Sequence, residues 1–280
     1  MSQNQIKKPA RAPLDYLGMP AMKAWLFGVF AFLYTPLFVL MLFSFNDSKA
    51  NIVWKGFTFK WYVKAFENDQ LREALFNSLL IAAVTTAISL VIGALMAFMF
   101  WRFKFPYKGS LESGMNLPIV VPEICFGVAV LLFFAKIGFP TNLPYPFNLS
   151  QIIIAHVAFT FPFVAIVVRA RLESFNPELE FAALDLGASP FRAFRDVIVP
   201  HMHPGLVAGG LLAFTLSLDD FVITFFASGP GTITFPVKVY SMVRFSVTPE
   251  VNAASTIIIV ITVLATVFAL RAQNTIKKER

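Results

Sequence analysis

The chain has 280 residues, of which 57% are hydrophobic and only 14% are charged, and its formal net charge is +7. An ordinary soluble domain carries about 25% charged residues, so this composition excludes one and indicates an integral membrane protein. The basic residues mostly flank apolar runs, which favours membrane orientation and attraction to acidic lipid headgroups over nucleic-acid binding. The single cysteine, Cys125, excludes a disulfide framework and a cysteine-based metal cluster.

Six apolar segments are long enough to cross a bilayer as helices, because a spanning helix needs about 20 residues. They cover residues 23–44, 75–101, 116–137, 151–169, 203–227 and 255–271. With the tails at 1–22 and 272–280 assigned to the cytoplasm, fifteen lysines and arginines lie inside and eight lie outside. The positive-inside rule favours that orientation. The sequence therefore predicts an all-α integral membrane protein with six transmembrane helices and both termini in the cytoplasm.

The first segment, Ala24 to Phe43, is longer than the apolar core of a signal peptide and lacks a small-residue cleavage site, so we expect a retained helix. The loop that follows, residues 45–74, is periplasmic in this topology and contains Trp54 and Trp61. Its length and aromatic content predict a small folded cap or a collar at the membrane interface.

The third segment contains Pro118 and Pro122, which predict a kink or an interrupted start because proline lacks the N–H that a helix interior needs. Glu123 follows directly. An acidic side chain inside a membrane is by default a candidate for the transport pathway. The alternative is that Glu123 caps a broken helix.

Residues 170–202, between the fourth and fifth segments, form a longer connection than adjacent membrane helices require. Asn176 as an N-cap and Pro177 at the first helical position predict a helix start, and Gly187 predicts its end. The Ser-Pro pair at 189–190 predicts a second start. One apolar face of the first helix is formed by Leu179, Ala182, Ala183 and Leu186. Because so short a helix is marginal in water alone, this face either packs on the protein's own helix ends or fits a groove on a cytoplasmic partner.

The fifth segment carries two adjacent acids, Asp219 and Asp220. An ionised Asp at a helix centre costs about 2.5–3.5 kcal/mol, so neither is expected to face lipid. On a continuous helix Ser217, Asp220 and Thr224 form a polar stripe, whereas Asp219 points to another side. We expect the stripe to line the pathway, with Asp219 at the cavity edge or bonded to a neighbouring helix. The reverse assignment and a structural role for both acids are the alternatives.

Two or three carboxylates with no intramembrane lysine or arginine in the central segments favour a cationic substrate. The sequence contains no G-x-x-x-x-G-K-[ST] loop for nucleotide phosphates. It also shows no nucleophile–base set, so we expect neither an enzyme nor a bound cofactor, and any ATP hydrolysis must occur on another polypeptide. His201 and His203 lack further ligands nearby, so no metal site is expected.

The segment EFAALDLGASPFRAFRDVIVP, residues 180–200, resembles the EAA loop in membrane subunits of bacterial ABC importers. The residues that match the family's spacing are Ala182, Ala183, Gly187 and Pro200. Phe181 occupies the place of the family's Glu, with Glu180 just before it. The resemblance implies that this segment, including Leu186, is a coupling helix that docks on a separate ATPase. Whether Glu180 replaces the missing acid stays open.

Two further stretches, YTPLFVLMLFSFNDSK and LAFTLSLDDFVITFFASGPGTITFPVKVYSMVRFSVTPEVNA, resemble permeases of putrescine/spermidine importers. The resemblance implies the type I ABC importer permease fold, with residues 75–271 as its core, in the bacterial inner membrane. It also implies a second homologous permease, a periplasmic polyamine-binding protein and an ABC ATPase dimer that binds ATP and Mg.

Three alternatives remain at this point. The first is an ion-coupled secondary transporter or cation channel, which would work without partners. The second is a membrane assembly protein with no pathway. The third is an ABC permease for another substrate, although the acids argue against an anion. The residues do not choose between putrescine and spermidine.

Overall fold

The computed structural model describes residues 20–48, 53–140, 142–229, 231–245 and 249–278. Most of the N-terminal tail and the last two residues of the C-terminal tail therefore lie outside the described residues. The part that is described is helical apart from one isolated bridge between Asn46 and Phe57. In chain order its elements are α1 (Pro20–Phe43), α2 (Lys60–Glu67), α3 (Asp69–Arg102), α4 (Lys108–Met115), α5 (Leu117–Val120), α6 (Glu123–Ile137), the 3₁₀ turn η2 (Phe147–Leu149), α7 (Ser150–Glu173), α8 (Glu178–Asp185), α9 (Pro190–Ala193), the π-helical turn η3 (Phe194–Ile198), α10 (Val199–Leu218), α11 (Val222–Ala227), α12 (Phe235–Phe245) and α13 (Pro249–Lys278).

The core of the molecule is the three-helix packing of α3, α7 and α10. Small residues let these helices approach closely, as in many membrane bundles. A Cβ added at Gly93 of α3 would lie 2.7 Å from the Cβ of Val164, and one at Gly209 of α10 would lie 3.3 Å from Val164 Cγ1. Gly205 similarly faces Arg171. The glycine pair four residues apart on α10 therefore serves packing against α7 within the chain.

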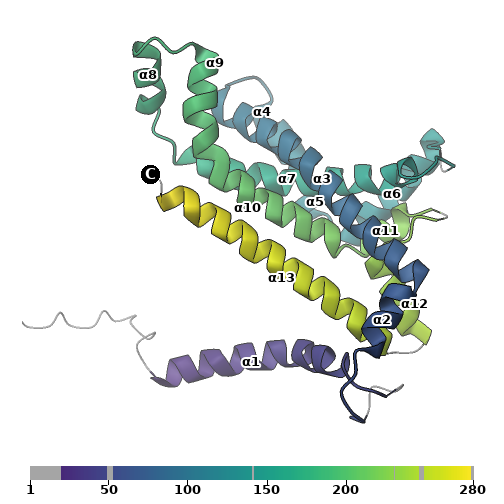
Figure 1. Cartoon of the computed structure of the whole chain (residues 1–280). Helices are drawn as coiled ribbons and strands as arrows, with labels where there is room; N and C mark the ends of the chain where they lie inside the picture. Colours follow the sequence, from purple (N-terminus) through teal and green to yellow (C-terminus); the bar gives the residue numbers. More distant parts are fainter. Residues whose placement is uncertain (1–19, 49–52, 141, 230, 246–248, 279–280) are drawn as a thin grey trace, which may run out of the picture.

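Four helical stretches in the described part are long and apolar enough to cross a membrane: Pro20–Phe43, Asp69–Arg102, Phe147–Glu173 and Pro190–Leu218. Residues Pro249–Leu264 of α13 form a shorter apolar helix. Figure 1 shows α3, α10 and α13 running beside one another, whereas α1 lies apart and approaches the bundle near α2 and α13. The described side chains of α1 are largely exposed, as expected for a helix whose surroundings are lipid.

Two of the predicted segments are broken helices. The segment predicted at 116–137 divides into α5 and α6, because Val121 is extended before Pro122, as residues before proline prefer. The continuous helix predicted for 203–227 is wrong, since α10 begins earlier, at Val199, and ends at Leu218, before α11 begins at Val222. The two breaks belong to neighbouring elements, because α11 packs on α6 and a Cβ added at Gly127 would lie 2.8 Å from the Phe226 ring.

The described part of the loop after α1 is folded. Asn46 is fully buried, its side chain donates to Val53 O at 2.8 Å and accepts from Lys55 N at 2.8 Å, and its carbonyl accepts from Trp61 Nε1 at 2.7 Å. The second long helix also starts earlier than residue 75, because Asn68 caps it by accepting from Leu71 N. This loop is therefore a compact unit that joins α1 to α3.

Candidate functional site

The helical hairpin of α8 and α9 stands at one end of the bundle (Figure 1). α8 begins at Glu178, one residue later than predicted, so Pro177 precedes the helix, and Asn176 Oδ1 accepts the Glu178 N–H at 3.1 Å. Gly187 has φ +87°, a conformation that favours glycine. Its N–H bonds to Leu184 O at 2.9 Å and the next N–H, from Ala188, bonds to Ala183 O at 3.0 Å. These two bonds form a Schellman C-cap, so the sequence's local signals account for how α8 begins and ends.

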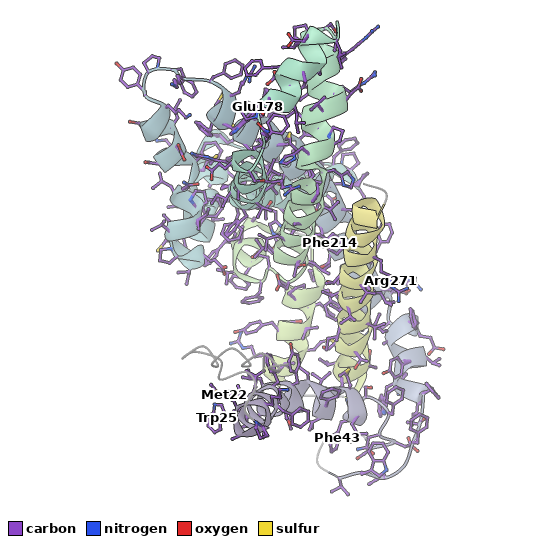
Figure 2. All side chains as sticks on the ribbon, turned by 90° about the vertical axis from the view of Figure 1, so that its left-hand side faces the viewer. Met22, Trp25, Phe43, Glu178, Phe214 and Arg271 are labelled. Carbon is purple, nitrogen blue, oxygen red and sulfur yellow. The ribbon has the colours of Figure 1, made fainter. Side chains whose placement is uncertain are left out.

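Three large apolar residues on α8 and at its C-cap are not covered by the described part of the chain. Phe181 is 58% exposed and Leu186 is 89% exposed, and Leu179 is also exposed. A shallow groove of about 330 Å³ runs between α8 and the start of the next helical stretch, with Leu186 and Val197 among its lining residues. Of the two alternatives for this face, packing on the protein's own helix ends is therefore not what the structure shows. Figure 2 places Glu178, at the start of α8, at the opposite end of the molecule from Phe43.

Glu180 does not point outward with the exposed residues of α8. It is buried, and Arg102 at the end of α3 donates to both of its carboxylate oxygens, each at 2.9 Å. Such a bidentate pair fixes geometry as well as charge. Glu180 is thus engaged within the chain, and the neighbouring position that faces outward carries Phe181.

Asp220 is a capping residue. It follows the end of α10, and its carboxylate accepts the N–H groups of Ile223 at 3.2 Å and Thr224 at 2.9 Å, which starts α11. An acceptor at a helix N-terminus satisfies N–H groups that have no partner within the helix. The side chain of Asp220 is also buried, at 6% exposure. Its local hydrogen bonds explain why the chain breaks here rather than continuing as one helix.

His156 of α7 joins this cap to two other elements. Its Nδ1 lies 2.8 Å from Ser217 Oγ on α10, and its Nε2 lies 2.8 Å from Thr224 Oγ1 on α11 and 3.4 Å from Asp220 Oδ1. The predicted polar stripe of Ser217, Asp220 and Thr224 therefore exists, but it closes on a buried histidine. Only the fold identifies these partners of His156, because they lie at least 61 residues away in the chain.

Asp219 has the opposite environment. It is exposed, and it contributes to a groove of about 250 Å³ whose other lining residues, among them Thr215 and Thr262, come from α10 and α13. Glu123 is also exposed, in the first turn of α6 directly after the break at Pro122. Asp219 lies within electrostatic range of Glu123 and Asp220. Neither Asp219 nor Glu123 forms a salt bridge with a described residue, so both carboxylates are available to a cation.

The described residues include no group of three or more His, Cys, Asp or Glu side chains arranged to hold a metal ion. Pro200 follows the π-helical turn η3 inside the continuous helical stretch Pro190–Leu218. Arg195 and Asp196 form an exposed pair in η3.

Comparison with known proteins agrees with this geometry. The permease PotI of the putrescine transport system of Escherichia coli is 38% identical over 231 residues, 82% of each chain. The permease PotC of the E. coli spermidine/putrescine transport system is 36% identical over 236 residues, 84% of this chain and 87% of PotC. A bacterial ABC transporter that imports the acidic polysaccharide alginate has a subunit of the same fold, with a TM-score of 0.70 and 19% identity, covering 92% of this chain and 94% of that one.

The family described as binding-protein-dependent transport system inner membrane component matches residues 89–279, well over half of the chain and all of the α8–α9 hairpin. The resemblance to ABC importer permeases drawn from residues 180–200 is confirmed. The chain therefore belongs to this family of inner-membrane transport components.

Proposed function

We propose that this chain is the permease subunit of an ATP-driven importer of putrescine, spermidine or a closely similar polyamine, and that it forms half of the translocation pathway. The observation that carries the proposal is the 36–38% identity, over more than four fifths of the chain, to permeases whose names specify these substrates. An alginate importer shares the fold but at 19% identity, so that likeness bears on architecture alone.

Membership of the family places the chain in the bacterial inner membrane as a multi-pass permease without catalytic activity of its own. ATP and Mg belong to a separate ATPase subunit. The proposed assembly contains a second homologous permease, an ATPase dimer and a periplasmic polyamine-binding protein. Four long apolar stretches, the broken pair α5–α6 and the helix α13 support six membrane segments in the type I importer fold with cytoplasmic termini.

The acids at the helix breaks supply the substrate chemistry. Asp219 and Glu123 are exposed and have no described salt-bridge partner, so they fit the ammonium groups of a polyamine. We assign the pathway role to this pair. Ser217, Asp220 and Thr224 instead hold the α10–α11 junction together through His156. This is the reverse of the assignment expected from a continuous helix.

The exposed hairpin supplies the coupling. Phe181, Ala182 and Leu186 are exposed, Ala183 is half-buried beside them, and Gly187 sets the turn that follows. A small exposed apolar surface of this kind fits a groove on a protein partner. We assign it to the ATPase, whose closure on ATP would displace the hairpin and turn the bundle from inward-open to outward-open as a rigid body.

The test is reconstitution of the complex that co-purifies with the tagged chain. Identification of an ATPase and a second permease in that complex, and polyamine uptake into liposomes only with ATP and the binding protein, are the expected results. A monomer that transports cations without nucleotide would instead support a secondary transporter or channel. Uptake of a different substrate class by the same complex would retain the permease role and remove the polyamine.

A further inference from the structure

The C-terminal residues of α3 contact the α8–α9 hairpin and its two flanking segments at three points. Phe98, Trp101 and Arg102 share one helix face, since they are spaced i, i+3 and i+4. The Phe98 ring packs edge-on against Phe194 of η3 at a centroid distance of 5.0 Å, and the Trp101 ring packs against Phe175, just before α8, at 5.7 Å. Arg102 makes the bidentate pair with Glu180 inside α8. One turn of one helix thus contacts the hairpin before, within and after its exposed part.

The ion pair is the strongest of the three contacts. Glu180 has 9% of its side chain exposed and Arg102 has 40%, so the pair is partly removed from water. Breaking such a pair leaves a buried charge without a partner, which is far more costly than losing a surface pair. Because α8 is only eight residues long and bounded by turns on both sides, this contact also fixes the rotation of α8 relative to α3.

The N-terminal part of α3, about two turns after its start at Asp69, is bonded to a different segment. Ser78 Oγ accepts the N–H of Phe235 at 2.8 Å, and Asn77 Nδ2 donates to Ile233 O at 3.2 Å. Ser78 and Phe235 are both buried. The tied residues immediately precede and begin α12, which follows the α11 segment that Asp220 caps. In Figure 1, α3 runs as one helix from the α2 and α12 end of the molecule toward the α8–α9 end.

We propose that α3 acts as a rigid rod, which here means a continuous helix that transmits a displacement along its length. Arg102, at the C-terminal end of α3, is displaced with α8, and Asn77 and Ser78, in its N-terminal part, transmit that displacement to residues 233–235 and so to the outer part of the pathway. Arg102, Glu180 and Ser78 are positioning residues in this proposal, which rests on the proposed function. About 24 residues of uninterrupted helix, or about 36 Å, separate Ser78 from Arg102, so the two residues cannot contact each other directly.

The first experiment tests the ion pair in the complete importer in liposomes, with polyamine taken up per ATP hydrolysed as the readout. Glu180→Gln should lower this ratio by about tenfold, within the usual range of coupling between distant sites. Glu173→Gln is the matched control, because Glu173 pairs with Arg169 inside α7 and is exposed. The single variants Arg102→Glu and Glu180→Arg should each lower uptake per ATP. The double variant that combines them should restore much of this loss, because the ion pair forms again with its charges exchanged. A normal ratio in Glu180→Gln would overturn the proposal.

The second experiment tests whether both ends act through one element. Ser78→Ala removes the acceptor for Phe235 N–H and should also lower uptake per ATP. Effects of independent sites this far apart add in free energy. For independent sites, the fold losses in uptake per ATP of the two single variants would therefore multiply in the double variant. A shared rod instead predicts that Ser78→Ala combined with Glu180→Gln is no worse than the more severe single variant. Multiplied losses, or normal coupling in Ser78→Ala, would overturn the rod. Absence of ATP-driven polyamine uptake by the unmodified complex would instead contradict the proposed function.

Discussion

Asp219 and Asp220 are adjacent in the chain, yet their side chains differ in hydrogen bonding and in exposure. Asp220 satisfies two backbone N–H groups at the start of α11 and lies next to His156, whereas Asp219 is exposed beside a groove. A buried carboxylate with several hydrogen bonds stabilises the fold. An exposed carboxylate without a described partner contributes little to the fold and is free to meet a cation.

This difference predicts opposite outcomes for two matched substitutions. Asp220→Ala removes the cap, which is worth about 0.5–2 kcal/mol, and should lower the Tm of the detergent-purified protein by several degrees. Asp219→Ala should leave the Tm unchanged and lower ATP-driven polyamine uptake by about tenfold, because it removes a carboxylate that we propose to lie on the path of a cation. Thermal melting and uptake measured on the same preparations check both effects. A large drop in Tm with Asp219→Ala, or full uptake by that variant, would contradict the division of roles.

At the scale of elements, the residues to which we assign the pathway and coupling roles lie at or beside helix ends. The α5–α6 and α10–α11 breaks interrupt apolar segments and place Glu123 and Asp219 beside non-helical backbone. Inside a membrane such backbone is tolerated only against protein or a wet cavity. The α8–α9 turn at Gly187 sets the direction of an exposed apolar hairpin. Uninterrupted helices such as α3 and α7 provide the frame between these sites.

The turn at Gly187 therefore tolerates few side chains. At φ +87°, a β-branched residue is strained, at a cost of about 1–2 kcal/mol. Gly187→Val should tilt or fray α8 and uncouple ATP hydrolysis from uptake while the bundle still inserts. Gly28→Val in α1 is the control, because an added Cβ there meets nothing within 4 Å. The measurement is membrane-inserted protein, ATPase rate and uptake for both variants, and full transport by Gly187→Val would refute the coupling role of this turn.

For the whole molecule, the sequence predicted the limits of α8 from local patterns but missed one local cap and one contact between distant residues. The start and end of α8 follow from Asn176, Pro177 and Gly187, which act within a few residues. The break before α11 was missed because the apolar run 203–227 is long enough for one helix, although the Asp220 side chain offers the backbone N–H groups a local alternative to that helix. The partner of Glu180 was missed because Arg102 lies 78 residues away in the chain and only the α3–α7 packing brings them together.

The exposed surface of the α8–α9 hairpin leads to a prediction for the assembly as a whole. Leu186 is 89% exposed in the isolated chain, and burial of a leucine side chain is worth about 1.5–3 kcal/mol. If the ATPase covers it, Leu186→Ala should weaken ATPase binding by about tenfold, since each 1.4 kcal/mol is a factor of ten in Kd. Asp185→Ala truncates a neighbouring side chain with little loss of apolar area and should have a smaller effect. Titration of the purified ATPase onto the permease in nanodiscs measures both. Equal affinity of the ATPase for Leu186→Ala and for the unmodified chain would mean that Leu186 stays in water when the ATPase is bound. The proposed displacement of α8 and α3 would then lack the contact between Leu186 and the ATPase from which it begins.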